Sequence, residues 1–493
     1  MAVSELRLRD VNGEPARPDG EWVVYWMTAA RRTRHNAALE RALELARGFD
    51  RPLFVLEALR CDHPWASARL HAFALGGMAC NARAFEKTGV LYHPYVEPAP
   101  GAGRGLLEAL ARRACCVVSD DSPAFFLPAM LQAAGARLRV RLEAVDGNGL
   151  LPLRATARVF LTAFSLRAFL QRELAPHLGE RPRPEPLRAR ATRPLRALPR
   201  EIATRWPAAA PELLGLEAAA LSRLRVDQGV RRAPLDGGSQ AGRRALRRFV
   251  AERLARYAED RNAPLDGAAS GLSPWLHWGH VGAHEVLAEL ERAGPWSARD
   301  VAGESRGGRR GAWWGADAST EAFLDQLVTW RELGLHFAQR RPDHGRYESL
   351  PAWAQATLAA HAQDPREPCY GRARLESART HDALWNAAQR QLVAEGVLPN
   401  YLRMLWGKKV LEWSRSPRAA LAHLIELNNR YALDGRDPNS ESGIFWTLGR
   451  FDRPWGPARP IFGLVRYMSS AATRKKLDVD GYLERWGARA GSG

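Results

Sequence analysis

The chain has 493 residues, of which 46% are hydrophobic and 17 are tryptophan, so it is too long for one ordinary core and too apolar to be disordered. No run of 18 apolar residues occurs and the N-terminus is charged from its start, so we expect a cytoplasmic protein that does not enter a membrane. The formal net charge of +18 favours an anionic partner, with nucleic acid the leading candidate, although a high-GC genome also enriches arginine.

The cysteines carry no metal-binding or disulfide pattern. There is no CxxC pair, and no cysteine spacing matches a histidine pair. We therefore expect no bound metal and a reducing compartment. The five cysteines are Cys61, Cys80, Cys115, Cys116 and Cys369.

The first 145 residues alternate between short apolar runs and helical patterns. Apolar runs of five or six residues are typical of strands buried on both faces, and their alternation with helices predicts a parallel, doubly wound sheet. No GxGxxG follows the first strand, so the dinucleotide fingerprint is absent. The predicted elements are strand 21–26, helix 36–48, strand 51–59, helix 67–88, strand 90–97, helix 103–113, strand 115–121 and helix 123–135.

The rest of the chain changes character twice. Proline and arginine dominate 180–211, which predicts an extended segment on the surface. After 212, helical patterns follow one another, several of them preceded by a capping Ser, Thr or Asp, and strand-like alternation is missing. The predicted organisation is an α/β N-terminal domain at 1–145, an extended interdomain linker at 146–211 and an all-α C-terminal domain at 212–493.

A turn of small and hydroxyl residues, Ser270, Gly271, Leu272 and Ser273, precedes a predicted helix. Free backbone N–H groups and hydroxyls at a helix start suit a phosphate. Most S-x-x-S helix starts only cap the helix, so both interpretations remain open for this stretch.

Two stretches near the C-terminus gather charged residues. Between 428 and 446, Asp434, Arg436 and Asp437 fall within four residues, which is more ionisable groups than a turn requires, although such loops usually only turn the chain. Between 454 and 479, interleaved aromatics and cations fit stacking on bases with phosphate neutralisation, and fit equally a packed C-terminal helix. The aromatics are Trp455, Phe462 and Tyr467, and the cations are Arg459, Arg466, Arg474, Lys475 and Lys476.

Three tryptophans fall within thirty residues of one another. Trp406 and Trp413 are seven residues apart on a predicted helix, so they share a face at about 10 Å along its axis, and Trp385 lies upstream. That spacing permits electron hopping between indoles. It is also what a core repeat produces, and the spacing alone favours packing.

Five sequence words that begin between 380 and 479 resemble, in their order and spacing, the class II cyclobutane pyrimidine dimer photolyases of the photolyase/cryptochrome superfamily. The first strand with its arginine-rich loop and the stretch 256–279 are similar to the same superfamily, whereas 140–210 resembles it weakly. The resemblance implies an α/β domain followed by an all-α domain that binds FAD, with damaged DNA as the partner; we expect a monomer. The five words are THDALWNAAQ, RMLWGKKVLEWS, LNNRYALDGRDPN, VRYMS and RKKLDVDGYLERW.

The resemblance also implies where the cofactor sits. The phosphates of FAD would lie near Tyr257 and the Ser270–Ser273 turn, and Arg403 and Asn428 would lie beside the flavin ring, where Asn428 stabilises the reduced form. The implied cofactor-binding residues are Tyr257, Ser270, Gly271, Leu272, Ser273, Arg403, Asn428, Asp434 and Asp437, with Asp434 near the ribityl and ribose.

The implied reaction is light-driven electron transfer from reduced FAD to a flipped dimer, which splits the cyclobutane ring. Trp406, Trp385 and Trp413 would reduce the flavin after light absorption. The residues implied to face the lesion or the DNA are Trp330, Trp446 and Arg466, the last of which would fill the gap left by the flipped dimer.

Several positions depart from the family's wording. Gln326 stands where the family has a glutamate close to the dimer; an amide still donates hydrogen bonds but carries no charge, and Asp325 is either a substitute or an exposed helix residue. Ala269 replaces a threonine, and 150–175 differs most, which leaves an antenna chromophore of the deazaflavin type open. The alternatives are a cryptochrome-like photoreceptor without repair activity and a light-independent nucleic-acid-binding protein.

Overall fold

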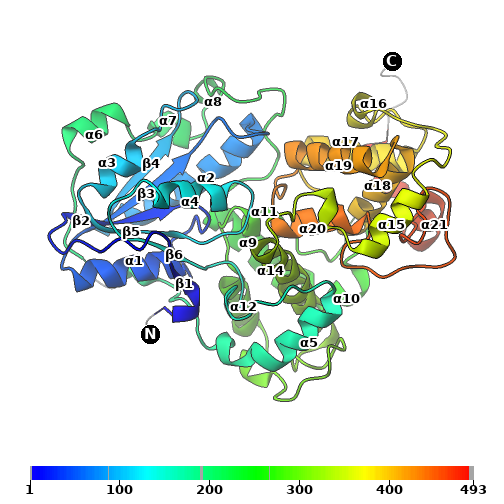
Figure 1. Cartoon of the computed structure of the whole chain (residues 1–493), viewed down its shortest axis with the longest axis horizontal. Helices are drawn as coiled ribbons and strands as arrows, with labels where there is room; N and C mark the ends of the chain where they lie inside the picture. Colours follow the sequence, from blue (N-terminus) through cyan, green and yellow to red (C-terminus); the bar gives the residue numbers. More distant parts are fainter. Residues whose placement is uncertain (1–2, 87, 189–191, 266, 488–493) are drawn as a thin grey trace. The chain divides into compact units, whose positions relative to one another are not determined.

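The computed structural model describes residues 3–86, 88–188, 192–265 and 267–487 (Figure 1). The chain forms two compact units, and it passes between them more than once. Unit 1 comprises Met1–Ala157, Glu173–Arg247 and Leu272–Ala298, and unit 2 comprises Arg158–Arg172, Arg248–Gly271 and Arg299–Gly493. The domain boundaries expected from the sequence, at 145 and 211, stay a prediction.

Unit 1 is built on a six-stranded sheet with the order β1-β6-β5-β2-β3-β4. All neighbouring pairs are parallel except β1 and β6, which are antiparallel with Leu8 opposite Val145. The predicted fold class is confirmed, with the correction that the sheet is mixed. The strands are β1 Leu8–Asp10, β2 Trp22–Met27, β3 Leu53–Leu59, β4 Leu91–Val96, β5 Ala114–Asp120 and β6 Leu142–Val145.

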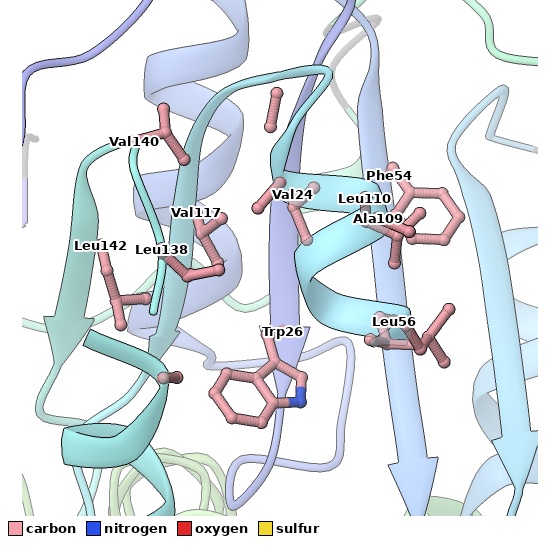
Figure 2. Packing of buried hydrophobic residues seen from close by; sticks show 14 of the residues in the cluster. Val24, Trp26, Phe54, Leu56, Ala109, Leu110, Val117, Leu138, Val140 and Leu142 are labelled. Carbon is pink, nitrogen blue, oxygen red and sulfur yellow. The ribbon is translucent and has the colours of Figure 1, made fainter. Parts of the chain in front are cut away.

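Helices cover both faces of this sheet, because successive side chains of a buried strand point to opposite sides. In β2, Val24 and Trp26 pack with Leu110 of α3 on one face, as Figure 2 shows, whereas Val23 and Tyr25 pack with helix α1 on the other. The unit 1 helices are α1 Ala37–Gly48, α2 Ala68–Phe85, α3 Leu106–Ala111, α4 Leu127–Gly135, α6 Arg200–Arg205, α7 Pro211–Leu214, α8 Ala218–Leu221, α11 Ser273–His277 and α12 Ala283–Ala293, and α9 Ser239–Glu252 begins there.

A carboxylate at the end of β5 fixes the loop that follows β2. Asp120 Oδ2 accepts hydrogen bonds from the backbone N–H groups of Thr28, Ala29 and Ala30 at 2.7–3.0 Å, and Asp120 Oδ1 accepts one from the Tyr25 hydroxyl at 2.9 Å. Together these bonds hold the start of the arginine-rich loop against the carboxyl ends of the parallel strands.

The described part of unit 2 consists of helices and connecting loops. Side-chain caps start several of its helices. Asp382 accepts from Trp385 N at 3.0 Å at the start of α17, and Ser416 and Asp437 cap α19 and α20, each followed by proline at the first helical position. No helix in the described residues is long and apolar enough to cross a membrane. The helices are α5 Ala163–Glu173, α10 Tyr257–Asp260, α13 Ala318–Leu324, α14 Arg331–Arg340, α15 Ala352–Ala360, α16 Arg372–Glu376, α17 Ala383–Glu395, α18 Asn400–Trp413, α19 Pro417–Tyr431, α20 Pro438–Trp446, α21 Ser470–Lys476 and α22 Asp480–Trp486.

Candidate functional site

Three buried tryptophans of unit 2 form a continuous series of ring contacts. The Trp385 ring from α17 is stacked with the Trp406 ring from α18, with centroids 6.3 Å apart and planes 5° apart. The same Trp385 ring meets Trp413 edge-on, with centroids 5.7 Å apart. All three side chains are at most 3% exposed. Trp406 and Trp413 thus lie on one helix, as the spacing predicted, but a tryptophan of another helix contacts both of them.

Both indoles of the stacked pair donate to neutral oxygens. Trp385 Nε1 donates to the backbone oxygen of Trp406 at 3.0 Å, and Trp406 Nε1 donates to Gln389 Oε1 at 2.9 Å. Gln389 is buried. A buried indole N–H needs such a partner, and these two fix the ring positions. Sequence reasoning missed Gln389; its position one turn after Trp385 on α17 was the available signal.

The far end of the series meets a tyrosine–histidine pair. The Trp413 ring lies 5.6 Å from Tyr370 and 5.0 Å from His381, centroid to centroid. The Tyr370 hydroxyl is hydrogen-bonded to His381 Nδ1 at 2.9 Å. Lys409 Nζ lies 5.6 Å from the Trp413 centroid and forms an ion pair with Glu412 at 2.6 Å.

A polar cluster joins α18 to α19 and α20. A single nitrogen of Arg403, Nη2, donates to both carboxylate oxygens of Asp434, at 2.9 and 3.1 Å. Ser440 Oγ accepts from Asn428 Nδ2 at 3.0 Å and from Arg403 Nη1 at 3.4 Å. The structure therefore brings Arg403, Asn428 and Asp434 together, and it adds Ser440, which sequence reasoning missed because a serine in a polar turn carries no distinguishing signal.

The turn after Asp434 is held by Asn429 of α19. Arg436 has φ +66°, and its N–H and Nη1 donate to the side chain and backbone oxygens of Asn429, both at 3.0 Å. Burial lowers the pKa of the Arg436 guanidinium to about 10. Asp437 accepts from Asn439 N at 2.8 Å as the cap of α20. The structure thus gives Asp437 a capping contact, and its role toward a cofactor stays a prediction.

The residues expected near phosphates lie where the chain leaves unit 2. Tyr257 is buried, its ring meets Phe249 and Phe323 edge-on at 5.8 and 5.4 Å, and burial raises its pKa to about 12. Gly271 is exposed, and its φ of +67° is a backbone conformation that favours glycine. Ser270 and Gly271 belong to unit 2, whereas Leu272 and Ser273, the start of α11, belong to unit 1.

Gln326 and Trp330 lie on a π-helical segment, Asp325–Trp330, between α13 and α14. Such segments are rare and frequently occur at functional sites, because the wider turn re-aims side chains. Both residues are half-buried, and Trp330 Nε1 is a buried donor without a hydrogen-bond partner among the described residues. A polar ligand group would satisfy it. No sequence pattern distinguished this segment from an ordinary helix.

Asp325 is committed to an ion pair with α5. Arg167 Nε and Nη2 donate to its two carboxylate oxygens at 2.7 and 3.1 Å, and Arg310 Nε lies 3.7 Å away. Both partners are largely buried. Its charge is therefore balanced within the fold. Asp325 is not an exposed helix residue.

Cations flank Trp446 and Trp455. Lys408 Nζ lies 4.5 Å from the Trp446 ring centroid, and the guanidinium carbon of Arg466 lies 5.9 Å from it. Arg466 also lies 4.2 Å from Trp455, whose ring has Arg453 at 4.5 Å. Trp446, Trp455 and the exposed Arg466 are thus within one patch at the end of α20 and the loop after it. Sequence reasoning missed Lys408.

Curated relatives share nearly the whole chain. A deoxyribodipyrimidine photo-lyase of Methanothermobacter thermautotrophicus is 31% identical over 97% of this chain and 97% of its own length. Those of Oryza sativa and Potorous tridactylus are 33% and 32% identical over 97% and 92% of this chain and 89% and 79% of their own lengths. No protein-family model matches. The chain belongs to the deoxyribodipyrimidine photo-lyase family of enzymes.

Solved structures show the same fold. A bacterial class III photolyase from Agrobacterium tumefaciens superposes with a TM-score of 0.68 at 18% identity, covering 95% of this chain and 86% of that one. A cryptochrome from Synechocystis superposes with a TM-score of 0.65 at 16% identity, covering 94% of this chain and 88% of that one. The α/β region and the helical region described above are thus those of the photolyase/cryptochrome fold.

Proposed function

We propose that this chain is a light-driven DNA-repair photolyase that binds FAD and splits cyclobutane pyrimidine dimers. The observation that carries the proposal is the series of ring contacts Trp406–Trp385–Trp413, buried and fixed by neutral hydrogen-bond acceptors. Packing alone requires no such unbroken contact. In a family of photo-lyases, it is the arrangement that lets an electron pass inward through the protein.

The polar cluster of unit 2 fits the ring of FAD. A flavin ring edge needs donors and acceptors side by side, and Asn428, Ser440 and the Arg403–Asp434 pair offer both. In this proposal Arg403, Asn428 and Asp434 hold the ring system, Tyr257 lies toward the phosphates, and Ser270–Ser273 and Asp437 stay predicted contacts. When bound and reduced, FAD supplies the electron that opens the cyclobutane ring under light.

The patch around Trp446 fits the lesion side of the site. A dimer stacked in a duplex is out of reach of a buried cofactor, so it must be flipped out. Trp446 and Trp330 then stack on the flipped dimer, the Gln326 amide donates to its carbonyl edge, and Arg466 enters the gap in the duplex. The partner is damaged DNA, and the class II assignment stays part of this proposal.

A cryptochrome-like photoreceptor without repair activity is the second candidate. The observation that favours it is Gln326, which carries no charge or acidic proton where the family's wording has a glutamate. Both candidates predict bound FAD and photoreduction. They are distinguished by whether the protein prefers and repairs dimer-containing DNA.

One experiment tests the proposal on the purified full chain. Absorption spectra before and after blue light with a thiol donor report bound FAD and its reduction, and a dimer-containing oligonucleotide is then assayed for restored pyrimidines in light and in darkness. We expect repair in light only. FAD that is photoreduced, with no repaired oligonucleotide and no preference for dimer DNA, would establish the photoreceptor instead. Colourless protein would contradict both candidates.

A further inference from the structure

Lys408 is a buried cation placed against the residue that we propose stacks on the dimer. It lies two residues after Trp406 on α18, and its side chain is 0% exposed. Its ammonium Nζ lies 4.5 Å from the centroid of the Trp446 ring. The same Nζ donates to the backbone oxygen of Thr447 at 2.8 Å and lies 3.5 Å from that of Trp446.

These carbonyls are the last of helix α20, where the helix dipole favours a positive charge. The lysine therefore holds Trp446 in two ways: by its ring face and by the end of the helix that carries it. Gly407 makes this approach possible, because a Cβ there would come within 2.4 Å of Thr447 Cγ2.

Packing does not explain a lysine at this position. No carboxylate of the described residues forms an ion pair with Lys408, and its desolvation lowers its pKa to about 7. The charged groups that face it are Asp452, which raises the pKa, and Arg466, which lowers it. A methionine would fill a similar volume without the cost of an unpaired buried charge. The ammonium thus has a use that an apolar side chain lacks.

We propose that Lys408 is a positioning residue for dimer recognition: in its charged form it fixes the Trp446 ring in the orientation that stacks on the flipped dimer. This inference rests on the proposed function. A cation on one ring face leaves the opposite face for the dimer. Arg466, also near this ring, is exposed and is the side chain that we propose enters the gap in the duplex. Lys408 is therefore the cation that stays beside the Trp446 ring when DNA is bound.

The protonation state of Lys408 distinguishes a positioning role from a packing role. A neutral amine still donates to Thr447, so the helix end stays bonded, but it loses the cation–π attraction that orients the ring. The preference for dimer over intact duplex should therefore fall about tenfold as pH rises from 6 to 9. In Lys408→Met the preference should be about tenfold lower than in the wild type at pH 6, and flat with pH.

The neighbouring lysine provides a matched control. Lys409 is also buried, but it is paired with Glu412 and lies near Trp413 instead of Trp446. Lys409→Met removes a charge from the same helix, and it should leave both the dimer preference and its pH profile unchanged. Affinity for intact duplex should be the same in all three proteins, because Lys408 is too buried to touch a phosphate.

Two measurements on the full chain test the inference. The chain has only five lysines, so 13C-lysine NMR with Lys408→Met for assignment reads the titration of Lys408 directly; we expect a midpoint near 7. Competition binding with fluorescent dimer-containing and intact duplexes gives the preference at each pH. A dimer preference that stays constant across the midpoint that NMR gives for Lys408 would overturn the inference.

The second measurement separates two failures. A wild type that prefers dimer DNA, with Lys408→Met showing the same preference and pH profile, leaves the proposed function standing and removes Lys408 from it. A wild type without dimer preference at any pH from 6 to 9 contradicts the proposed function itself, and the inference with it.

Discussion

Two groups of indoles in the helical unit have opposite surroundings. Trp385 and Trp406 contact each other and donate to neutral oxygens, and no cation of the described residues lies over either ring. Trp446 and Trp455, by contrast, are each flanked by cations, with Lys408 at 4.5 Å from Trp446 and Arg466 between the two.

The difference decides which indoles can pass on an electron. An indole that gives up an electron becomes positive, and a unit charge 4.5 Å away opposes this by about 4 kcal/mol at an effective dielectric of 20. The unpaired cation therefore disfavours oxidation of Trp446, whereas the neutral pair remains oxidisable and Lys409, near Trp413, is paired with Glu412. One helix, α18, supplies both Trp406 and Lys408, so the two kinds of surroundings arise within a single turn.

Burial of the charged Lys408 should lower the free energy of unfolding in a pH-dependent way. Because burial depresses the pKa of Lys408 to about 7, the unfolded chain binds more protons between pH 7 and about 10, and wild-type stability rises across that window. Lys408→Met lacks this dependence. Its unfolding free energy relative to the wild type should fall by roughly 4 kcal/mol from pH 6 to pH 10 in urea titrations. Parallel curves for the two proteins would mean that Lys408 stays charged.

Removing the stacked partner should break electron flow and nothing else. Trp406→Phe keeps an aromatic ring in place but one that is far harder to oxidise, so photoreduction of the flavin by blue light should slow about 100-fold, or roughly 3 kcal/mol. FAD content should be unchanged, since the polar cluster is intact. Trp446→Phe is the control and should photoreduce at the wild-type rate. Normal photoreduction in Trp406→Phe would make the three tryptophans core residues only.

Removing the Trp446 indole should weaken binding of dimer DNA and leave photoreduction intact. Trp446→Ala loses a base-stacking surface worth about 1–3 kcal/mol, so affinity for dimer DNA should fall about tenfold while photoreduction persists. Affinity for intact duplex should change little. Equal loss for both duplexes, measured by fluorescence anisotropy, would mean that Trp446 serves general DNA binding and does not recognise the lesion.

Much of this contrast lies beyond sequence reasoning. The strands of β2, β3, β4 and β5 could be predicted because each is long enough to show its apolar pattern, whereas β1 has three residues and β6 four. The spacing placed Trp406 and Trp413 on one helix, but Trp385 comes between them through tertiary packing. Lys408 and Gln389 owe their partners to other turns or other helices, and no local pattern records such contacts.

The smallest expected effect concerns the missing glutamate. Gln326→Glu restores a group that makes charge-assisted hydrogen bonds, about twice as strong as those of an amide. The adjacent Asp325 cannot have supplied this group, because Arg167 holds both of its carboxylate oxygens. Repair per absorbed photon should therefore rise about threefold in Gln326→Glu and fall in Gln326→Leu, in single-turnover flashes on bound dimer DNA. A yield that is the same in the wild type and Gln326→Glu would show that the amide already does what the dimer requires.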